Sequence, residues 1–264
     1  MKKIVTILLL ALTAFAGCSK DENPTPVPAA PVGGVISLRS EGALGNEPAA
    51  KAATRGDVTA EQTLTYTFEA WTKDTNPRCV LHKTANGTLA AAAIEIALVP
   101  GTYDFLFWAD YSKGAYTTDN LRQVSLARTS YTPGSGRDAF AFALPGVQWN
   151  GGSGVSAMLK RPLAKLAMLN EAAFGTGGQE VSVTYTNVPT QYDVLTETTS
   201  APQTLTLAFP ATTAGADLVG EDFLFVPSVG QSVGLSITVG SVTKGLDMLQ
   251  LQRNYTTNVT ASFE

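Results

Sequence analysis

Residues 101–110 have the sequence Gly-Thr-Tyr-Asp-Phe-Leu-Phe-Trp-Ala-Asp, which is the clearest indication of the fold. Successive side chains of a β-strand point to opposite faces. In this segment both faces are apolar, one with four side chains and the other with two: Tyr103, Phe105, Phe107 and Ala109, against Leu106 and Trp108. The pattern therefore predicts a central strand with one side in the core.

Segments of the same period lie on both sides of it. Upstream, apolar residues alternate over residues 64–70 and 94–98, and the Pro100-Gly101 pair predicts a turn. Downstream, six more apolar segments recur, at residues 163–169, 181–185, 205–209, 223–226, 233–239 and 255–263. We find no long amphipathic helix between them. Short strands separated by turn residues predict an all-β fold, either a sandwich or a barrel.

The chain of 264 residues is long enough for one large or two small domains after a signal peptide over residues 1–17 is removed. The tetrapeptide at residues 104–107, Asp-Phe-Leu-Phe, recurs at residues 222–225, which hints at two similar halves. We expect an N-terminal β-sandwich over residues 56–160 and a C-terminal β-sandwich over residues 161–264.

The first residues have the features of a bacterial lipoprotein signal peptide. Two lysines precede an apolar run that ends at Ala16, which is too short for the roughly 20 residues of a membrane-spanning helix. Phe15-Ala16-Gly17-Cys18 resembles the lipobox, where signal peptidase II cuts before the cysteine that carries the lipid. We therefore predict that acyl chains on Cys18 anchor the protein in outer-membrane lipid. The alternative is an ordinary signal peptide with a chance cysteine.

Residues 18–55 are predicted to form a lipidated tether and pro-segment. Ser19-Lys20-Asp21-Glu22 resembles the signal that sends some lipoproteins to the outer face of the outer membrane, although a charge run can also be a plain solvated tether. A Pro-rich spacer follows over residues 23–31. The apolar Val35-Ile36-Ser37-Leu38 then predicts a short isolated strand, and residues 40–54 predict a loop.

Residues of the kind that carry out catalysis are scarce and scattered. His82 is the single histidine, which excludes a histidine-pair zinc site, and the acidic residues show no local pairing of the kind a glycosidase needs. The net charge of −4, with acids and bases interspersed, argues against nucleic-acid binding. We therefore expect no enzymatic activity, no metal and no other cofactor.

Cysteine and tryptophan leave two smaller questions. If Cys18 carries lipid, Cys79 has no disulfide partner, and its place at the start of an apolar segment predicts a buried strand position. Trp71, Trp108 and Trp149 could stack on sugars, but large aromatic residues on strands more often belong to the core.

Several motifs, taken in their order along the chain, carry a family resemblance: Cys18, Val35–Leu38, Thr54–Gly56, Gly101–Asp110, Arg161–Leu166 and Gln252–Thr257. Together they resemble the fimbrillin-type subunits of type V pili, a broad group of FimA-like shaft pilins and FimB/Mfa-like accessory subunits. The resemblance covers most of the chain. It implies two consecutive transthyretin-like β-sandwich domains with Greek-key connections.

The resemblance also implies assembly by strand exchange between pilus subunits. The lipidated precursor would reach the cell surface with Val35–Leu38 filling a groove of its own domain. An Arg-specific surface protease would cut between Arg55 and Gly56, and the strand would leave. A strand of another subunit would then be added to the groove. The candidate donor is the C-terminal segment, in which alternate residues share one face: Tyr255, Thr257, Val259, Ala261 and Phe263.

The resemblance thus predicts a structural or accessory subunit of a surface fimbria that supports adhesion. Thr257 and Ala261 are small or polar, so the donor segment would fill an apolar groove only modestly. The chain could therefore instead be an accessory or anchor subunit that keeps its first strand and its lipid. The alternative of a different class is a non-polymerising surface lipoprotein that binds glycans. That alternative predicts exposed aromatic side chains in a row on one face.

Overall fold

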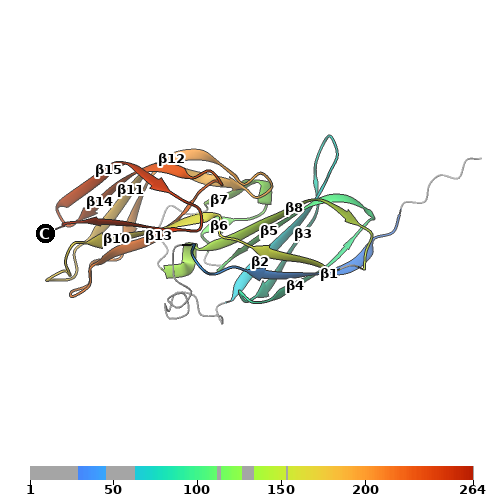
Figure 1. The fold of residues 1–264 in the computed structure, drawn as a ribbon, viewed down its shortest axis with the longest axis horizontal. Coiled ribbons are helices and arrows are strands. Elements are labelled where there is room, and N and C mark those ends of the chain that lie inside the picture. The colour runs from blue at the N-terminus through green and yellow to red at the C-terminus, as the bar shows by residue number, and fades with distance from the viewer. Residues whose placement is uncertain (1–28, 46–62, 112–113, 127–133, 153, 264) are drawn as a thin grey trace, which may run out of the picture.

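The computed structural model describes residues 29–45, 63–111, 114–126, 134–152 and 154–263 (Figure 1). These residues form β-strands and two short 3-10 helices and contain no α-helix, so the all-β prediction is confirmed. Figure 1 shows an elongated molecule, with the first strands on the right and the last strands on the left. No helix within the described ranges is long and apolar enough to span a membrane.

The first sandwich consists of a three-stranded sheet of order β4-β1-β9 and a four-stranded sheet of order β3-β2-β5-β8. The bounds of its strands are β1 Val32–Ser40, β2 Leu64–Thr72, β3 Cys79–Gly87, β4 Ala92–Leu98, β5 Gly101–Asp110, β8 Ala139–Trp149 and β9 Val155–Leu159.

The second sandwich has a three-stranded sheet of order β13-β10-β16, opposite a larger sheet in which β12 and β14 flank β11 and β15 follows β14. Its strands are β10 Leu163–Asn170, β11 Val181–Asp193, β12 Thr198–Phe209, β13 Leu218–Phe225, β14 Gln231–Val239, β15 Val242–Leu251 and β16 Thr256–Ala261.

The two sandwiches have the same connectivity, strand for strand. In each of them the first strand lies in the middle of the smaller sheet, antiparallel to one neighbour and parallel to the other. Thus β1 pairs with β4 and β9 as β10 pairs with β13 and β16. The tetrapeptide echo does not reflect this duplication, because residues 104–107 lie on β5 whereas residues 222–225 lie on β13. The topological counterpart of β5 is β14.

Strand β5 has the two apolar faces that its sequence indicates. Phe105 and Phe107 belong to the core of the first sandwich, whereas Leu106 and Trp108 belong to a separate cluster that also contains Phe225 of β13. All five side chains are buried. Since full burial of each such side chain contributes about 1.5–3 kcal/mol, both faces of β5 stabilise the fold.

The junction between the sandwiches is part of this second cluster. Between β5 and β8 the chain forms β6 (Tyr116–Thr117), the 3-10 helix η1 (Leu121–Gln123), β7 (Val124–Leu126) and the 3-10 helix η2 (Gly134–Arg137). Strand β7 pairs with the end of β11, where Val124 lies opposite Tyr192. The N-terminal half therefore supplies two short strands to the larger sheet of the second sandwich. The boundary predicted at 160/161 falls between β9 and β10. Strands β6 and β7 precede that boundary in the sequence but belong to the larger sheet of the second sandwich.

Candidate functional site

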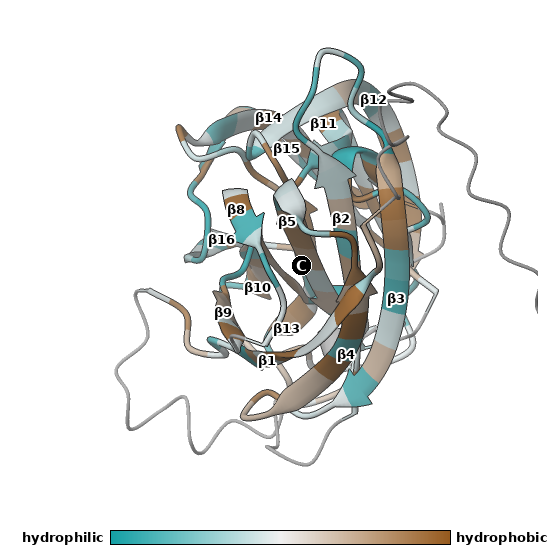
Figure 2. Cartoon of the chain, turned by 90° about the vertical axis from the view of Figure 1, so that its right-hand side faces the viewer, coloured by the Kyte–Doolittle hydropathy of each residue, from teal (hydrophilic) through white to brown (hydrophobic). Residues whose placement is uncertain are grey.

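Strand β1 contains the four residues predicted to form a removable strand, Val35–Leu38, and it is longer than predicted. Figure 2 shows β1 between β9 and β4 in the smaller sheet of the first sandwich. Ile36 lies opposite Ile94 of β4 and Val155 of β9. The sequence predicted an isolated strand here, whereas in the structure this strand is the central one of its sheet.

The side chains of β1 alternate between the core and solvent. Ile36 is fully buried and Leu38 is nearly so, whereas Val35 is 45% exposed and Ser37 and Arg39 are exposed. Only two of the nine residues of β1 are buried. The strand is thus bound strongly through its backbone and only modestly through its side chains.

Gly34 lets the start of β1 pass beneath an aromatic ring. A Cβ atom at Gly34 would lie 2.4 Å from Cη2 of Trp149, so a larger residue there would force the ring to move. The indole Nε1 of Trp149 donates a hydrogen bond to the carbonyl of Val32 at 3.2 Å. Trp149 therefore lies against β1 at Val32 and Gly34.

After β1 the chain crosses from the first sandwich to the second as residues 41–45, which we call the exit segment. Its first amide, of Glu41, donates to the carbonyl of Leu159 at 2.9 Å. Its last, of Gly45, donates to the carbonyl of Asn254 at 2.6 Å. Leu44 between them is buried. The predicted loop over residues 40–54 therefore begins with an ordered stretch that contacts both sandwiches.

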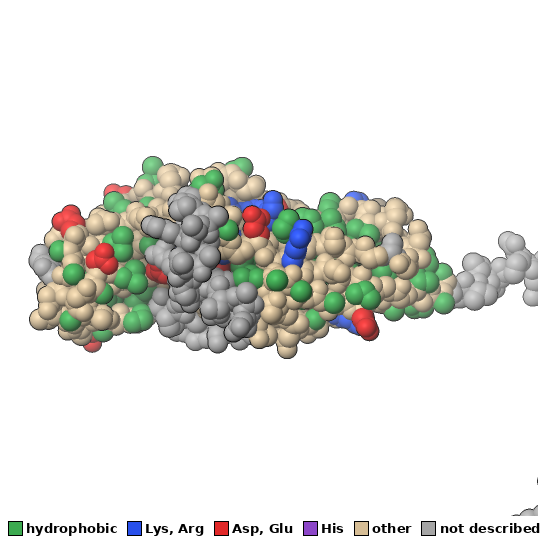
Figure 3. Space-filling view, turned by 60° about the horizontal axis from the view of Figure 1, so that its bottom comes forward, with side chains coloured by type: hydrophobic (Ala, Val, Ile, Leu, Met, Phe, Trp, Pro, Cys, Tyr) green, Lys and Arg blue, Asp and Glu red, His purple; other side chains and the backbone are tan. Residues whose placement is uncertain are grey.

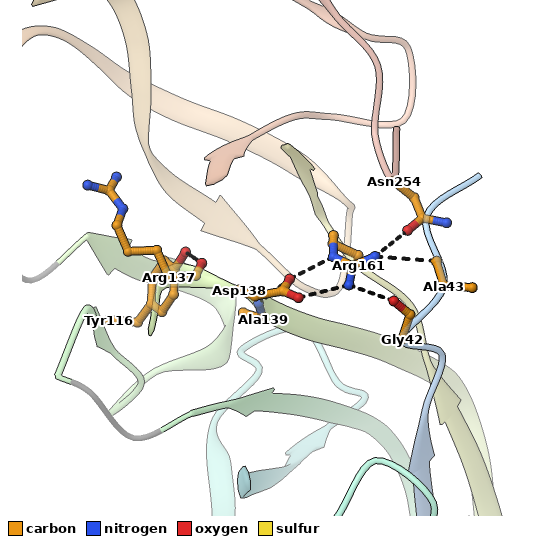
Figure 4. Close-up of polar contacts among 8 residues, drawn as sticks. All are labelled: Gly42, Ala43, Tyr116, Arg137, Asp138, Ala139, Arg161 and Asn254. Carbon is orange, nitrogen blue, oxygen red and sulfur yellow. Dashed lines mark hydrogen bonds and ion pairs between the residues drawn. The ribbon is translucent and has the colours of Figure 1, made fainter. Parts of the chain in front are cut away.

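Arg161 lies at the centre of this crossing (Figure 4). Its guanidinium is 2% exposed and binds Asp138 through two hydrogen bonds, Nε to Oδ1 at 2.6 Å and Nη2 to Oδ2 at 2.8 Å. It also donates to the carbonyls of Gly42 and Ala43 at 3.0 and 3.4 Å, and to Oδ1 of Asn254 at 2.7 Å. One buried cation thus joins the exit segment to the starts of β8 and β16.

A second buried ion pair lies near it, between Arg137 and Asp222 at 3.0 Å. The hydroxyl of Tyr185 and the amide of Phe223 donate to the same carboxylate. Burial raises the pKa of Asp222 above its ordinary value, and the positive charge of Arg137 opposes that rise. This pair connects η2, in the N-terminal half of the chain, to β13 of the second sandwich.

The predicted donor residues lie on and next to β16, within their own sandwich. Strand β16 runs parallel to β10, with Val259 opposite Met168. Val259 and Phe263 are buried, and Tyr255, Thr257 and Ala261 are half-buried. The C-terminal segment therefore completes the sheet of the chain to which it belongs, and its action as a donor to a second subunit stays a prediction. The structure does not bring β1 and β16 together in one sheet.

Other residues singled out in the sequence have structural places. Trp108 and Trp149 are buried, as expected of core residues, and Trp71 is half-buried beneath the guanidinium of Arg122. His82 lies at the rim, 38% exposed, with Nδ1 3.0 Å from Oε1 of the buried Glu69. These tryptophans do not form an exposed row for stacking on sugars.

The expectation that Cys79 is buried is wrong. Its thiol is exposed because β3 is the edge strand of its sheet and Cys79 is the first residue of that strand. Partial burial nonetheless raises the pKa of the thiol.

Three predicted site residues, Cys18, Arg55 and Gly56, lie outside the described residues. Within the described part of the chain, no group of three His, Cys, Asp or Glu side chains could hold a metal ion. On the face shown in Figure 3, charged side chains are scattered among apolar and polar ones.

Sequence reasoning missed the role of Arg161 altogether. Arg161-Pro162 is visible as a motif, but nothing in the sequence indicates that the arginine is buried or that it contacts residues 42 and 43. Only the combination of an arginine at a domain boundary with an aspartate just before β8 could have suggested an ion pair there.

Comparisons with known proteins place the fold. A structure from Bacteroides thetaiotaomicron VPI-5482, described as a polysaccharide-binding candidate of the DUF1812 group, is 10% identical and has a TM-score of 0.54; the match covers 81% of this chain and 80% of that one. The fimbrial anchor protein Mfa2 from Porphyromonas gingivalis is 13% identical, with a TM-score of 0.48 and 82% of each chain covered.

The tip fimbrial protein Mfa3 from Porphyromonas gingivalis is 12% identical, with a TM-score of 0.47, 82% of this chain and 81% of that chain covered. No curated protein matches this sequence. The model of one family, described as a family of unknown function (DUF6562), matches residues 33–263, from within β1 to the residues after β16. Because that match includes nearly all of both sandwiches, the chain belongs to the DUF6562 family.

Proposed function

We propose that this chain is a subunit of a bacterial surface fimbria that supports adhesion. It is exported as a lipoprotein through Cys18, and β1 is the strand that is exchanged during assembly. The observation that carries the proposal is that β1 is the middle strand of a three-stranded sheet and yet has only two buried side chains. Such a strand forms backbone hydrogen bonds on both sides, which a replacement strand could also form, and its departure exposes few buried side chains.

Withdrawal of β1 would create an acceptor for another strand. The strand is paired with β4 over seven residue pairs and with β9 over five. Its departure would leave two unpaired strand edges with the vacated positions of Ile36 and Leu38 between them. Unpaired edges beside an apolar groove are strong templates for strand addition, and another pilus subunit would supply the strand.

Cleavage between Arg55 and Gly56 by an Arg-specific surface protease is the proposed trigger. The site lies between the end of β1 at Ser40 and the start of β2 at Leu64. A cut anywhere in that interval ends the covalent connection between β1 and the rest of its sandwich. The C-terminal segment, Tyr255 to Phe263, is the proposed donor. Cys18 is the proposed lipidation site: signal peptidase II cuts before it, and its acyl chains attach the precursor to the outer membrane.

The test is cleavage of the intact chain by an Arg-specific protease, with Arg55→Lys as the matched control. We expect the wild-type chain to be cut after Arg55, to release the fragment that contains β1 and to form larger assemblies on size-exclusion chromatography. The Arg55→Lys chain should remain intact and monomeric. Release of the fragment without any larger assembly would contradict exchange between copies of this chain.

A second measurement, the N-terminus of the mature protein from cells, assigns the role within the fibre. A start at Gly56 supports a shaft subunit, whereas a start only at acylated Cys18 contradicts cleavage and supports an anchor that keeps β1. Replacement of Cys18 by Ala should release the protein from the membrane fraction if the cysteine carries the lipid.

The alternative function is a surface lipoprotein that binds glycans without polymerising. It is favoured by the similarity in fold to the Bacteroides thetaiotaomicron structure, which is described as a polysaccharide-binding candidate. Against it, Trp108 and Trp149 are buried and cannot stack on sugars. Saturable binding of a polysaccharide by the monomeric, uncleavable Arg55→Lys chain would support this alternative.

A further inference from the structure

The exit segment occupies a site of its own at the junction between the sandwiches. It receives contacts from Leu159 at the end of β9, from Arg161, and from Asn254 just before β16. Most of these contacts lie outside the sheet that β1 completes. The chain that fills the β1 position is therefore recognised twice, first within the first sandwich and again at the junction.

Recognition at the junction is directed at the backbone. Arg161 donates to the carbonyls of two successive residues, Gly42 and Ala43. The amides of Glu41 and Gly45 donate to main-chain carbonyls of the surrounding chain. Contacts of this kind do not depend on side-chain identity, so they suit any extended chain that follows the same path.

Two positions of the exit segment are nevertheless selective. The side chain of Leu44 is 7% exposed, which requires an apolar residue there. At Gly45 a Cβ atom would lie 2.7 Å from Cε2 of the Tyr255 ring, so the site accepts glycine and resists larger residues. An apolar residue followed by glycine is therefore the sequence that the site accepts.

Arg161 is held in place by contacts that do not involve the exit segment. Asp138 grips the guanidinium through two hydrogen bonds, and the ring of Phe140 lies beneath it at 5.1 Å. The fork of an arginine paired with a carboxylate is rigid and keeps its remaining N–H groups fixed in direction. Those groups point at the carbonyls of residues 42 and 43.

We propose that the junction is a peptide-binding site that extends the β1 groove into the second sandwich and fixes the register of the strand that fills it. Its occupant is the chain's own exit segment, in which Leu44 and Gly45 supply the apolar residue and the glycine. The part that the site plays in assembly rests on the proposed function, because the site is vacated only if β1 leaves. Arg161 acts as a positioning residue that slows the departure of β1.

The first test measures amide hydrogen exchange in the intact chain, where no cleavage is needed. Arg161→Lys keeps the charge but loses the fork, and loss of charged hydrogen bonds should raise exchange of the amides of residues 36–45 by about tenfold or more. Exchange in β11 and β14 should not change. The matched control is Arg253→Lys, because Arg253 binds Glu197 and Tyr192 rather than the exit segment.

A second pair of variants keeps the test valid if Arg161→Lys fails to fold. Gly45→Val should raise exchange of the same amides, because its side chain meets the ring of Tyr255. Adding Tyr255→Ala to Gly45→Val removes that ring and should restore much of the protection, which a general loss of stability would not allow. Unchanged protection of residues 36–45 in both Arg161→Lys and Gly45→Val would overturn the proposed site.

The cleaved protein separates this proposal from the proposed function. A synthetic peptide of residues 30–45 should replace the cleaved strand more effectively than a peptide of residues 30–40, and Arg161→Lys should abolish the difference. Equal competition by the two peptides overturns the junction site. If protection responds to the variants in the intact chain but β1 never leaves the cleaved one, the proposed function fails while the site stands as an internal clasp.

Discussion

Strands β1 and β10 occupy the same place in two sandwiches of identical connectivity, yet they are held in different ways. Seven of the eight residues of β10 are buried, compared with two of the nine in β1. Strand β10 also has a buried cation, because Lys165 binds Glu221 of β13 at 3.0 Å. The shared topology therefore does not determine how firmly the first strand of each sandwich is held.

The difference shows that backbone pairing and side-chain burial are separate contributions. Both strands have hydrogen-bonded neighbours on each side, but only β10 contributes side chains to two hydrophobic clusters, with Leu166 in one and Leu163 in the other. Strand β1 contributes Ile36 and Leu38 to a single cluster. Extensive pairing with little burial is the combination that the proposed strand exchange requires of β1.

The largest effect should come from the carboxylates beside the two strands. Asp222 lies on β13 next to β10 and is the partner of the buried Arg137. Asp222→Ala should therefore lower the free energy of unfolding by about 3–5 kcal/mol. Glu95→Ala, on the exposed face of β4 next to β1, should change it by less than about 0.5 kcal/mol. Urea unfolding of both variants checks this, and similar losses would remove the contrast between the two sheets.

The next largest effect concerns one leucine in each strand. Leu166→Ala and Leu38→Ala should each cost about 2–5 kcal/mol, since both side chains are buried. The difference should lie in where the loss appears. Native-state hydrogen exchange should show β1 opening locally in Leu38→Ala while β2 and β5 stay protected, and β10 opening only with global unfolding. Global opening in both variants would contradict the idea that β1 is separately removable.

A smaller effect is expected at two glycines beneath aromatic rings. At Gly34 in β1 and at Gly220 in β13 an added Cβ would lie 2.4 Å from a ring atom, of Trp149 and Phe209 respectively. Replacement by Ala should cost about 1–3 kcal/mol at either site. Thermal unfolding measures the loss, and hydrogen exchange should place it in β1 for Gly34→Ala and in the second sandwich for Gly220→Ala.

The smallest effect is expected on the exposed face of β1. Val35 is 45% exposed, and Val35→Thr keeps the β-branched shape, so stability should change by no more than about 0.5 kcal/mol. The rate of strand exchange after cleavage should be equally unaffected. A clear change in that rate would mean that the outer face of β1, and not only its buried face, controls exchange.

Sequence periodicity was sufficient for the all-β fold and for β5, because alternation of apolar side chains follows directly from strand geometry. It could not show that Val35–Leu38 lies in the middle of a sheet, since strand order depends on partners far away in the sequence. It also placed Cys79 in the core, because an apolar segment does not reveal that its strand lies at a sheet edge.

The candidate site was only partly visible in the sequence. The apolar segment Val35–Leu38 indicated a strand, but the exit segment after it was expected to be a plain loop. Its structure depends on the buried Arg161, which lies 119 residues further along the chain than Gly42, the residue whose carbonyl it binds. A contact of that separation between a charged side chain and a backbone carbonyl leaves no periodic signal in the sequence.

The pairing of β7 with β11 has a mechanical consequence. If the proposed fibre carries tension, a load applied to one sandwich must pass to the next. Here it passes through strand pairing and through the cluster of Trp108, Tyr192 and Phe225 as well as through the covalent connection between β9 and β10. The two sandwiches should therefore resist bending at their junction and move as one rigid unit rather than as two independently hinged domains.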